Sequence, residues 1–334
     1  MEMRQLGNLW PVSALTLGGG GLGLVWGNST REEAVATVRD AVDAGINFLD
    51  LAPLYGQAES VVGEAFDGSW PSHMRVSTKC MVGARHAEDI PGRLEKSVRL
   101  SLETLKRDHA DCYILHSNIH PDDYVYEKHP DYAAYGGISW SRFVGEVIPT
   151  FESLKAKGII GAWGVTGIGL PISVMEALRS EPNPDVVQVI ANLMDSAGGL
   201  KRYEEPTEPR NIIRTAKNND VGVMGIRAVQ AGALTAGFDR SMEADDPDMK
   251  DYEKAAPYRA LCKKWGEDPA VIAHRYALAI DGVDTVVLGV KNRTELSQLV
   301  AAAEKGPLEQ VQIDEIEALG LRRQIPRIPL DAPI

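Results

Sequence analysis

Short runs of β-forming residues alternate with longer helical patterns along the whole chain. Strand-like runs such as 74–79, 111–115, 186–190 and 221–226 are largely apolar, as expected of parallel strands that are covered on both faces. We count eight strand–helix units in the sequence, which predicts a closed (β/α)8 TIM barrel of the α/β class. No Pro/Gly/Ser-rich linker divides the chain, so residues 1–334 are expected to form a single barrel domain.

Additions to the barrel are predicted at both ends of the chain and after two strands. A hairpin over 4–12 is expected to cap the barrel, and an extra helix is expected over 313–323. Thr30 and Glu33 have the spacing of a capping box, which predicts a helix start. The stretches 117–142 and 228–257 are longer than ordinary loops, and their positions after strands four and seven place them at the C-terminal face, where barrel active sites lie.

The charge balance limits the possible partners. Lys and Arg number 35 and Asp and Glu number 47, which gives a net charge of −12. This excess of acid works against nucleic-acid or anionic-membrane binding and favours a small-molecule partner. Three widely spaced cysteines, with neither a signal-peptide pattern nor an apolar run long enough to span a bilayer, predict a cytoplasmic protein. The sequence gives no prediction of the oligomeric state.

Four polar residues come at or just after the ends of successive strands: Asp50, Tyr55, Lys79 and His116. Neighbouring strand ends meet at one face of a barrel, so these side chains are expected to converge. An ammonium beside a phenol favours the phenolate and lowers the phenol's pKa, while a carboxylate holds the ammonium in place. Tyr55 would then be a general acid toward an oxygen that gains negative charge, and His116 would orient the substrate.

Several ordered motifs carry a resemblance to a known family. They are the stretches 43–47, 50–56, 58–63, 76–79 and 101–116. Through these motifs the chain resembles the aldo-keto reductase family over nearly its whole length. The resemblance implies reduction of an aldehyde or ketone by NADPH or NADH, or the reverse oxidation of an alcohol. It also implies Tyr55 as acid/base, Asp50 and Lys79 as the pair that tunes it, and His116 as the substrate orienter.

Two segments are candidates for binding the coenzyme phosphates. The run 18–23, which includes Gly20, formally matches a dinucleotide fingerprint, but residues 24–28 intervene before the next helix, so close backbone approach at the barrel rim is the better interpretation. Gly289, Lys291 and Arg293 open a predicted helix, whose start favours anions. In the aldo-keto reductase family, which the chain resembles, this region holds the adenosine 2′-phosphate. The resemblance therefore favours NADP over NAD.

Further coenzyme contacts follow from the resemblance, with some departures from the family pattern. Thr166 and Gln188 match positions near the nicotinamide. Arg227 stands where the family commonly has a serine, and its guanidinium could instead clamp the pyrophosphate. Gln298 stands near the adenine, where the family commonly has Glu. Gly167 lacks a side chain where the family usually has Asn, and Ile226 stands where an aromatic residue is common. These departures leave the four polar residues intact but bear on coenzyme preference and affinity.

The substrate pocket is expected to involve Trp26 and the aromatic loop residues Tyr124, Tyr126 and Trp140. Aromatic faces pack against apolar and sugar-like molecules, which favours a carbonyl compound larger than a short aldehyde. The alternative is that these rings pack the loop against its own helix.

The sequence leaves two other function classes to compare with the reductase. A metal-dependent hydrolase on the same barrel would need clustered ligands, and the first strand, 15–19, carries none; no metal is therefore predicted. A non-catalytic or very slow nucleotide-binding barrel, acting as a sensor or accessory subunit, is the remaining alternative to the reductase.

Overall fold

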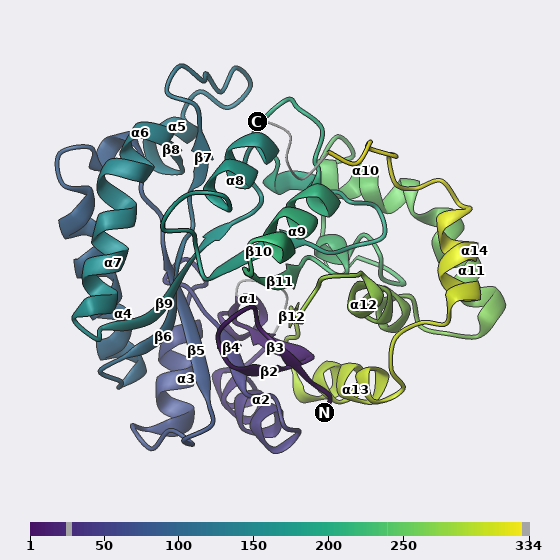
Figure 1. The fold of residues 1–334 in the computed structure, drawn as a ribbon. Helices are drawn as coiled ribbons and strands as arrows, with labels where there is room; N and C mark the ends of the chain where they lie inside the picture. The colour runs from purple at the N-terminus through teal and green to yellow at the C-terminus, as the bar shows by residue number, and fades with distance from the viewer. Residues whose placement is uncertain (25–28, 239, 329–334) are drawn as a thin grey trace.

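Eight parallel strands close into a barrel in the computed structural model, which describes residues 1–24, 29–238 and 240–328 (Figure 1). The predicted TIM barrel is therefore confirmed. In order around the barrel the strands are β3 (Leu15–Gly18), β4 (Phe48–Asp50), β5 (Arg75–Cys80), β6 (Ala110–Leu115), β9 (Ile160–Thr166), β10 (Val186–Ile190), β11 (Gly222–Ile226) and β12 (Thr285–Leu288).

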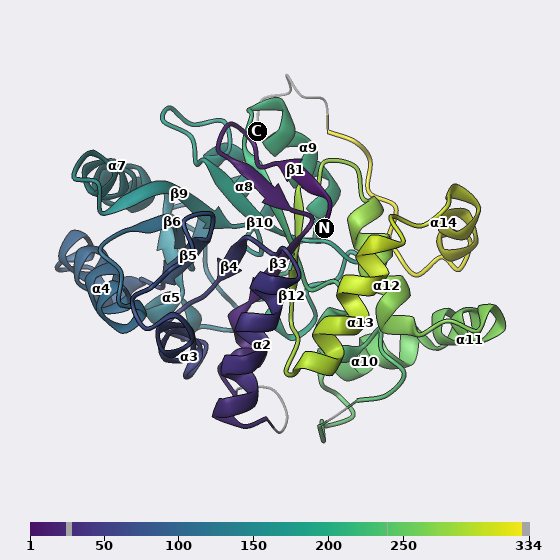
Figure 2. The ribbon, with the colours of Figure 1, turned by 90° about the horizontal axis from the view of Figure 1, so that it is seen from below.

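Helices surround the strands, as the view from below shows (Figure 2). They are α2 (Arg31–Asp43), α3 (Ala58–Phe66), α4 (Ile90–Leu105), α7 (Ile148–Ala156), α8 (Pro171–Ala177), α9 (Pro209–Asn218), α12 (Pro269–Ala279) and α13 (Arg293–Glu304). Within the described ranges no helix is both long and apolar enough to cross a membrane.

The predicted hairpin is present as the antiparallel pair β1 (Met3–Gln5) and β2 (Pro11–Ser13). Leu6 and Val12 from this hairpin are fully buried and cluster with Phe48, Ile114 and Met224 of the barrel strands. The hairpin therefore closes the end of the barrel where the strands begin, with apolar side chains. The opposite end, where the strands terminate, is left for polar residues.

The long segment after β6 contains structure of its own. It includes β7 (Asn118–His120), α5 (Tyr132–Tyr135), β8 (Gly137–Ser139) and α6 (Trp140–Arg142), and β7 and β8 pair in a small sheet outside the barrel. A π-helical turn (Phe143–Val147) then leads into α7. Elements of three or four residues are too short to show periodicity, so the sequence predicts only a loop here.

The long segment after β11 also differs from the prediction. It contains α10 (Pro247–Lys254) and is followed by α11 (Ala256–Trp265). Asp246 caps α10 by accepting a hydrogen bond from the Asp248 amide at 2.7 Å, with Pro247 in the first turn. Proline is favoured at a helix start, so the Asp-Pro pair marks a helix and not a loop.

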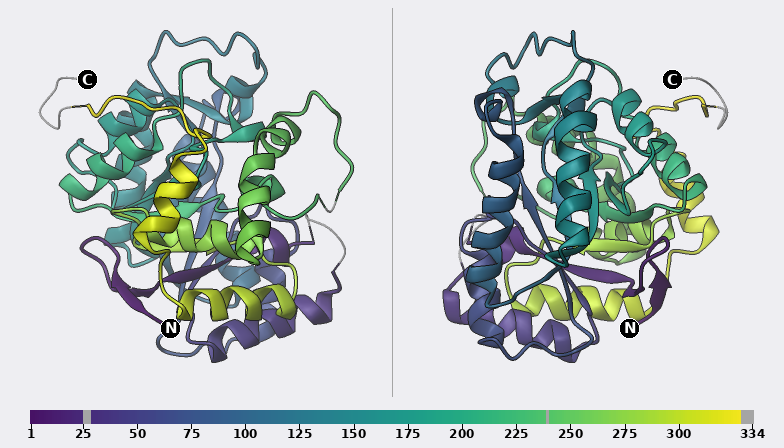
Figure 3. Two further views of the ribbon diagram at one scale, coloured as in Figure 1. Left: turned by 90° about the vertical axis from the view of Figure 1, so that its right-hand side faces the viewer. Right: turned by 60° about the vertical axis from the view of Figure 1, so that its left-hand side comes forward.

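The C-terminal helix α14 (Gln310–Glu317) lies earlier in the chain than the predicted 313–323. Gly320 has a φ of 64° and follows the helix end, as glycine commonly does. The segment after α14 runs back across the outside of the barrel (Figure 3). It contacts α9, where the side-chain amide of Asn211 donates to the Pro326 carbonyl at 3.1 Å.

Candidate active site

Asp50 and Lys79 form a buried ion pair at the end of the barrel where the parallel strands terminate. Lys79 Nζ lies 2.7 Å from Asp50 Oδ1, and the two side chains are 0% and 3% exposed. Lys79 Nζ also donates to the Leu51 carbonyl at 2.8 Å. Burial lowers the pKa of Lys79, but the charges of Asp50 and Tyr55 outweigh this effect and the net shift is upward. Lys79 therefore carries a fixed positive charge at neutral pH.

Two further side chains hold the Asp50 carboxylate. Ser77 Oγ and Gln188 Nε2 each donate to Asp50 Oδ1 at 2.7 Å. Ser77 was not among the residues predicted from sequence. It lies two positions before Lys79 on the same strand, so side-chain alternation could have placed it on the same inward face. The carboxylate that faces Lys79 is thus fixed by groups from β5 and β10.

Tyr55 lies in the turn after β4, beside both Lys79 and His116. Lys79 Nζ is 4.6 Å from the centre of the Tyr55 ring, and the Tyr55 and His116 rings meet edge-on with centroids 5.7 Å apart. Both rings are half-buried. The structure therefore brings together all four residues that the sequence predicts to converge.

The glycine-rich run packs directly against the Tyr55 turn. It forms the short helix α1 (Gly19–Leu22), and a side chain added at Gly23 would place its Cβ 1.7 Å from the Tyr55 carbonyl oxygen. An added Cβ at Gly21 would lie 1.9 Å from the Val290 carbonyl oxygen. These glycines allow close approach of the backbone on both sides, so they help to position Tyr55 as well as the segment after β12.

Burial sets the protonation states of the two aromatic acid/base groups. It raises the pKa of Tyr55, and the charge of Lys79, which acts in the opposite direction, does not cancel that effect. The sequence predicts only the lowering by Lys79. Burial, aided by the Lys79 charge, lowers the pKa of His116 to about 3. At neutral pH the site thus presents a protonated phenol, a neutral imidazole and an ammonium.

The lowered pKa of His116 has a consequence for stability. Between the ordinary histidine pKa and about 3, the unfolded chain binds a proton at His116 and the folded protein does not. The free energy of unfolding should therefore fall as the pH falls through this window, by up to about 1.4 kcal/mol per pH unit from this residue. We expect the free energy of unfolding of His116→Gln to lack this part of the pH dependence.

Urea unfolding of both proteins at pH 7, 6 and 5 tests this expectation. Other histidines with lowered pKa, such as His274, titrate in both proteins, so the difference between the two pH curves isolates His116. Parallel curves for the wild type and the variant would contradict the expectation.

The residues predicted near the nicotinamide lie at the ends of neighbouring strands. Thr166 and Gln188 are buried partners in the pairing of β9 with β10, and Ile226 ends β11. Gly167 donates its amide to the Gln188 carbonyl at 2.6 Å, and an added Cβ at Gly167 would lie 2.8 Å from that oxygen. The lack of a side chain at position 167 thus avoids a clash with the Gln188 carbonyl.

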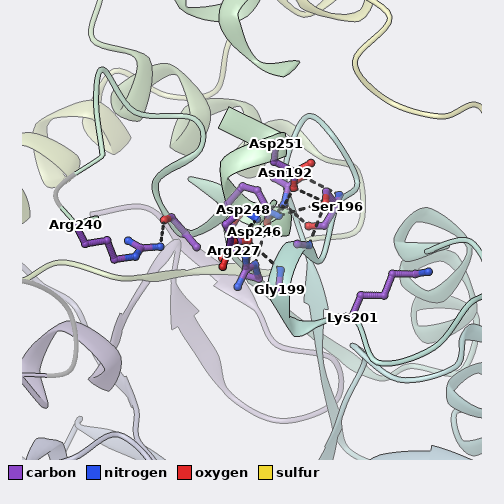
Figure 4. Close-up of polar contacts among 12 residues, drawn as sticks. Asn192, Ser196, Gly199, Lys201, Arg227, Arg240, Asp246, Asp248 and Asp251 are labelled. Atoms are coloured by element: carbon purple, nitrogen blue, oxygen red, sulfur yellow. Dashed lines mark hydrogen bonds and ion pairs between the residues drawn. The ribbon is translucent and has the colours of Figure 1, made fainter. Parts of the chain in front are cut away.

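Arg227, predicted to contact a pyrophosphate, is held in a network of polar side chains (Figure 4). Its Nη2 lies 2.7 Å from Asp248 Oδ1 in α10, and its Nε donates to Gln230 Oε1 at 2.9 Å. Gln230 is fully buried and also donates to Asp251 at 2.6 Å. The sequence did not predict this network, which fastens α10 to the end of β11.

The same network reaches the loop after β10. Asn192 donates to the carbonyls of Ser196 and Arg227 at 3.0 and 3.2 Å, and Ser196 Oγ donates to Asp251 at 2.5 Å. Asp248 also accepts a hydrogen bond from the Gly199 amide at 3.0 Å. The segments after β10 and β11 are therefore linked beside the barrel mouth.

Most of the residues predicted to bind the coenzyme phosphates and the adenosine lie just before or within α13, whereas Gly20 lies in α1. Gly20 is half-buried in α1. Gly289 is exposed, and a Cβ added there would have no described neighbouring atom within 4 Å. Lys291 and Arg293 lie just before and at the helix start, and Gln298 is exposed on α13. Both basic side chains contact carboxylates, Lys291 with Glu295 and Arg293 with Glu33.

The predicted substrate residues are placed differently from one another. Trp26 lies outside the described residues. Tyr124 and Trp140 are half-buried, but Tyr126 is only 3% exposed and packs edge-on against Tyr132 with centroids 5.2 Å apart. Tyr126 is thus packed within its own segment, as in the alternative interpretation of the aromatic residues. Tyr124 Oη donates to Glu205 Oε2 at 3.3 Å, which joins this segment to the one after β10.

The chain thus combines an eight-stranded barrel with a Tyr, Lys, Asp and His cluster at the strand ends. The family model for the aldo/keto reductase family matches residues 14–320. The chain therefore belongs to the aldo/keto reductase family. It is an NAD(P)-dependent oxidoreductase that acts on carbonyl and alcohol groups.

The relatives agree with this assignment. L-Galactose dehydrogenase of Arabidopsis thaliana is 29% identical over 327 residues, which cover 96% of this chain and 94% of the relative. D-Arabinose 1-dehydrogenase of Saccharomyces cerevisiae is 26% identical and covers 86% of this chain and 82% of its own length. The holo form of an aldo-keto reductase from Bacillus halodurans has the same fold, with a TM-score of 0.69, 23% identity and 96% coverage of both chains.

Proposed function

We propose that this protein interconverts a sugar-like hemiacetal or carbonyl compound and its oxidised or reduced form, with Tyr55 as the acid/base. The proposal is carried by one observation: Tyr55 lies against the buried Lys79–Asp50 pair on one side and His116 on the other. A phenol held beside a fixed ammonium can give up or take a proton at a substrate oxygen.

Each residue of the cluster has a distinct part in the proposed reaction. A bound nicotinamide supplies or accepts the hydride at the substrate carbon. In reduction, Tyr55 Oη gives its proton to the oxygen that gains negative charge, and Lys79 stabilises the phenolate that remains. His116, neutral because its pKa is about 3, can donate a hydrogen bond to the same oxygen and orient it. In oxidation the Tyr55 phenolate takes the proton from the substrate hydroxyl.

The coenzyme is proposed to lie along the strand ends from β9 to β12. Gln188, Thr166 and Ile226 would contact the nicotinamide, and Arg227 the pyrophosphate. Gly289 leaves open space at the end of β12, and Gly20 lies in α1, after the neighbouring strand β3. Lys291, Arg293 and Gln298 would face the adenosine. The sequence predicts a preference for NADP, but in the structure both basic residues have carboxylate partners.

The substrate class is proposed from the aromatic segment and the relatives. Trp26, Tyr124, Tyr126 and Trp140 were predicted from sequence, and of these Tyr124 and Trp140 have ring surface partly exposed. Two of the relatives are named as dehydrogenases of aldoses. A cytoplasmic location is also proposed, since all three cysteines are buried and free.

The experiment is a coenzyme-turnover assay with the purified protein. Aldoses and short alcohols with NAD or NADP, and short aldehydes with NADH or NADPH, are followed by the near-ultraviolet absorbance of reduced nicotinamide. We expect at least one aldose to exceed the short aldehydes and alcohols in kcat/KM by about tenfold or more, since a pocket that hydrogen-bonds hydroxyls discriminates against molecules that lack them. Equal turnover of short aldehydes would argue against the sugar-like substrate, and no turnover with any pair would argue against the proposed chemistry.

A further inference from the structure

The first turn of α13 is held by a carboxylate from a distant part of the chain. Asn292 caps this helix by accepting a hydrogen bond from the Glu295 amide at 2.9 Å. The Arg293 amide instead donates to Glu33 Oε1, also at 2.9 Å. Glu33 belongs to α2, which packs beside α13 (Figure 1). Free amides at a helix start attract anions, and here the anion is a side chain of the protein.

The same carboxylate also engages the Arg293 guanidinium. Arg293 Nη2 lies 3.0 Å from Glu33 Oε2, and Nε lies 3.2 and 3.3 Å from the two carboxylate oxygens. Hydrogen bonds from Arg293 lower the pKa of Glu33, so the carboxylate is ionised at neutral pH. Glu33 thus accepts hydrogen bonds from the backbone amide of Arg293 and from two of its guanidinium nitrogens.

Glu33 is not required for the cap of its own helix. The Thr30 side chain accepts a hydrogen bond from the Glu33 amide at 3.2 Å, which is one half of the predicted capping box. The other half would need the Glu33 carboxylate to reach back to Thr30, but that carboxylate is directed to Arg293. The pair is also partly exposed, with 53% of the Arg293 side chain accessible, so it contributes little to stability.

The second basic residue in this region is paired as well. Lys291 Nζ lies 3.3 Å from Glu295 Oε1, and the Lys291 amide donates to Glu295 Oε2 at 2.9 Å. The two positive charges of Lys291 and Arg293 are thus balanced by the two negative charges of Glu33 and Glu295. A phosphate monoester carries nearly two negative charges at pH 7. These residues, as arranged, do not fit a 2′-phosphate.

We infer that Glu33 makes the protein prefer NAD over NADP. This inference rests on the proposed location of the coenzyme's adenosine end at the start of α13. The Glu33 carboxylate holds the donors that a 2′-phosphate would need and repels that phosphate. A carboxylate can, by contrast, accept a hydrogen bond from a ribose hydroxyl.

The test is calorimetric binding of NAD and NADP to the wild type and to Glu33→Gln, without substrate. We expect the wild type to bind NAD at least about tenfold more tightly than NADP. In Glu33→Gln the Kd for NADP should fall by about tenfold and the Kd for NAD should change by no more than about twofold, since one charge near the phosphate is removed. The ratio of the wild-type Kd for NADP to that for NAD should decrease as the salt concentration is raised.

Glu32→Gln is the matched control. Glu32 is exposed in the same first turn of α2 and its carboxylate interacts with Thr30, so the variant removes the same charge without releasing Arg293. If Glu33→Gln fails to fold, Glu33→Ala provides a second test: it removes the same carboxylate, and the Kd for NADP should again fall while that for NAD stays near the wild-type value.

Each outcome bears on a separate proposal. Tighter wild-type binding of NADP than of NAD, or equal shifts in Glu33→Gln and Glu32→Gln, would overturn the role of Glu33 while the proposed function stands. Failure of the wild type to bind either coenzyme would overturn both. Selective gain of NADP binding in Glu33→Gln alone supports the inference.

Discussion

Tyr55→Phe should lower kcat by about 10² to 10⁴-fold, which is the range that a positioned general acid contributes. Phenylalanine keeps the ring that lies 4.6 Å from Lys79 Nζ and edge-on to His116. The substitution therefore removes the proton donor and little else. Coenzyme binding and the free energy of unfolding should stay close to their wild-type values.

The matched control is Tyr113→Phe. This tyrosine also loses one hydroxyl, but its Oη donates to the Leu94 carbonyl of α4 at 2.9 Å, outside the barrel mouth. Its turnover should resemble that of the wild type. Near-wild-type turnover in Tyr55→Phe would eliminate Tyr55 as the acid/base.

The pH profile provides a second measurement on Tyr55. Burial raises the pKa of this phenol, so the acid form predominates at neutral pH and the phenolate fraction grows about tenfold per pH unit below that pKa. Alcohol oxidation, which needs the phenolate, should therefore rise with pH between 7 and 9. Carbonyl reduction, which needs the phenol, should not follow that rise. In Tyr55→Phe the residual rates of oxidation and reduction should no longer differ in their dependence on pH.

The barrel and the four polar residues could be predicted because both depend on local patterns. The predicted strand 186–190 coincides with β10, and the predicted strand 221–226 coincides with β11 to within one residue. A strand's position in the chain fixes its neighbours in a parallel barrel, so Asp50, Lys79 and His116 could be expected to meet without knowledge of any distance.

What depends on long-range pairing could not be predicted. Glu33 and Arg293 are 260 positions apart in sequence, and the local spacing of Thr30 and Glu33 favours a complete capping box instead. Arg227 has a φ of 57° and pairs with Asp248 of α10, a helix that was not predicted. The pKa of Tyr55 was expected to be lowered because sequence shows the charges but not the extent of burial.

Lys79→Met should abolish most activity and also destabilise the fold. Lys79 is completely buried, and the variant would leave the Asp50 carboxylate buried beside a methionine, with Ser77 and Gln188 as its remaining donors. Removing one partner of a buried ion pair costs about 3–5 kcal/mol. The phenolate of Tyr55 would also lose its countercharge, which should lower kcat by about 10²-fold or more.

The double variant Asp50→Asn/Lys79→Met separates these two effects. It removes the stranded charge, and replacing a buried pair by neutral groups is often tolerated, so the free energy of unfolding should recover by about 2 kcal/mol or more relative to Lys79→Met. Turnover should not recover, because the ammonium beside Tyr55 is still missing. Urea unfolding and turnover of the wild type, both single variants and the double variant complete the cycle. Recovery of turnover together with stability would show that the pair acts only through folding, whereas recovery of stability alone would assign Lys79 a direct part in the chemistry at Tyr55.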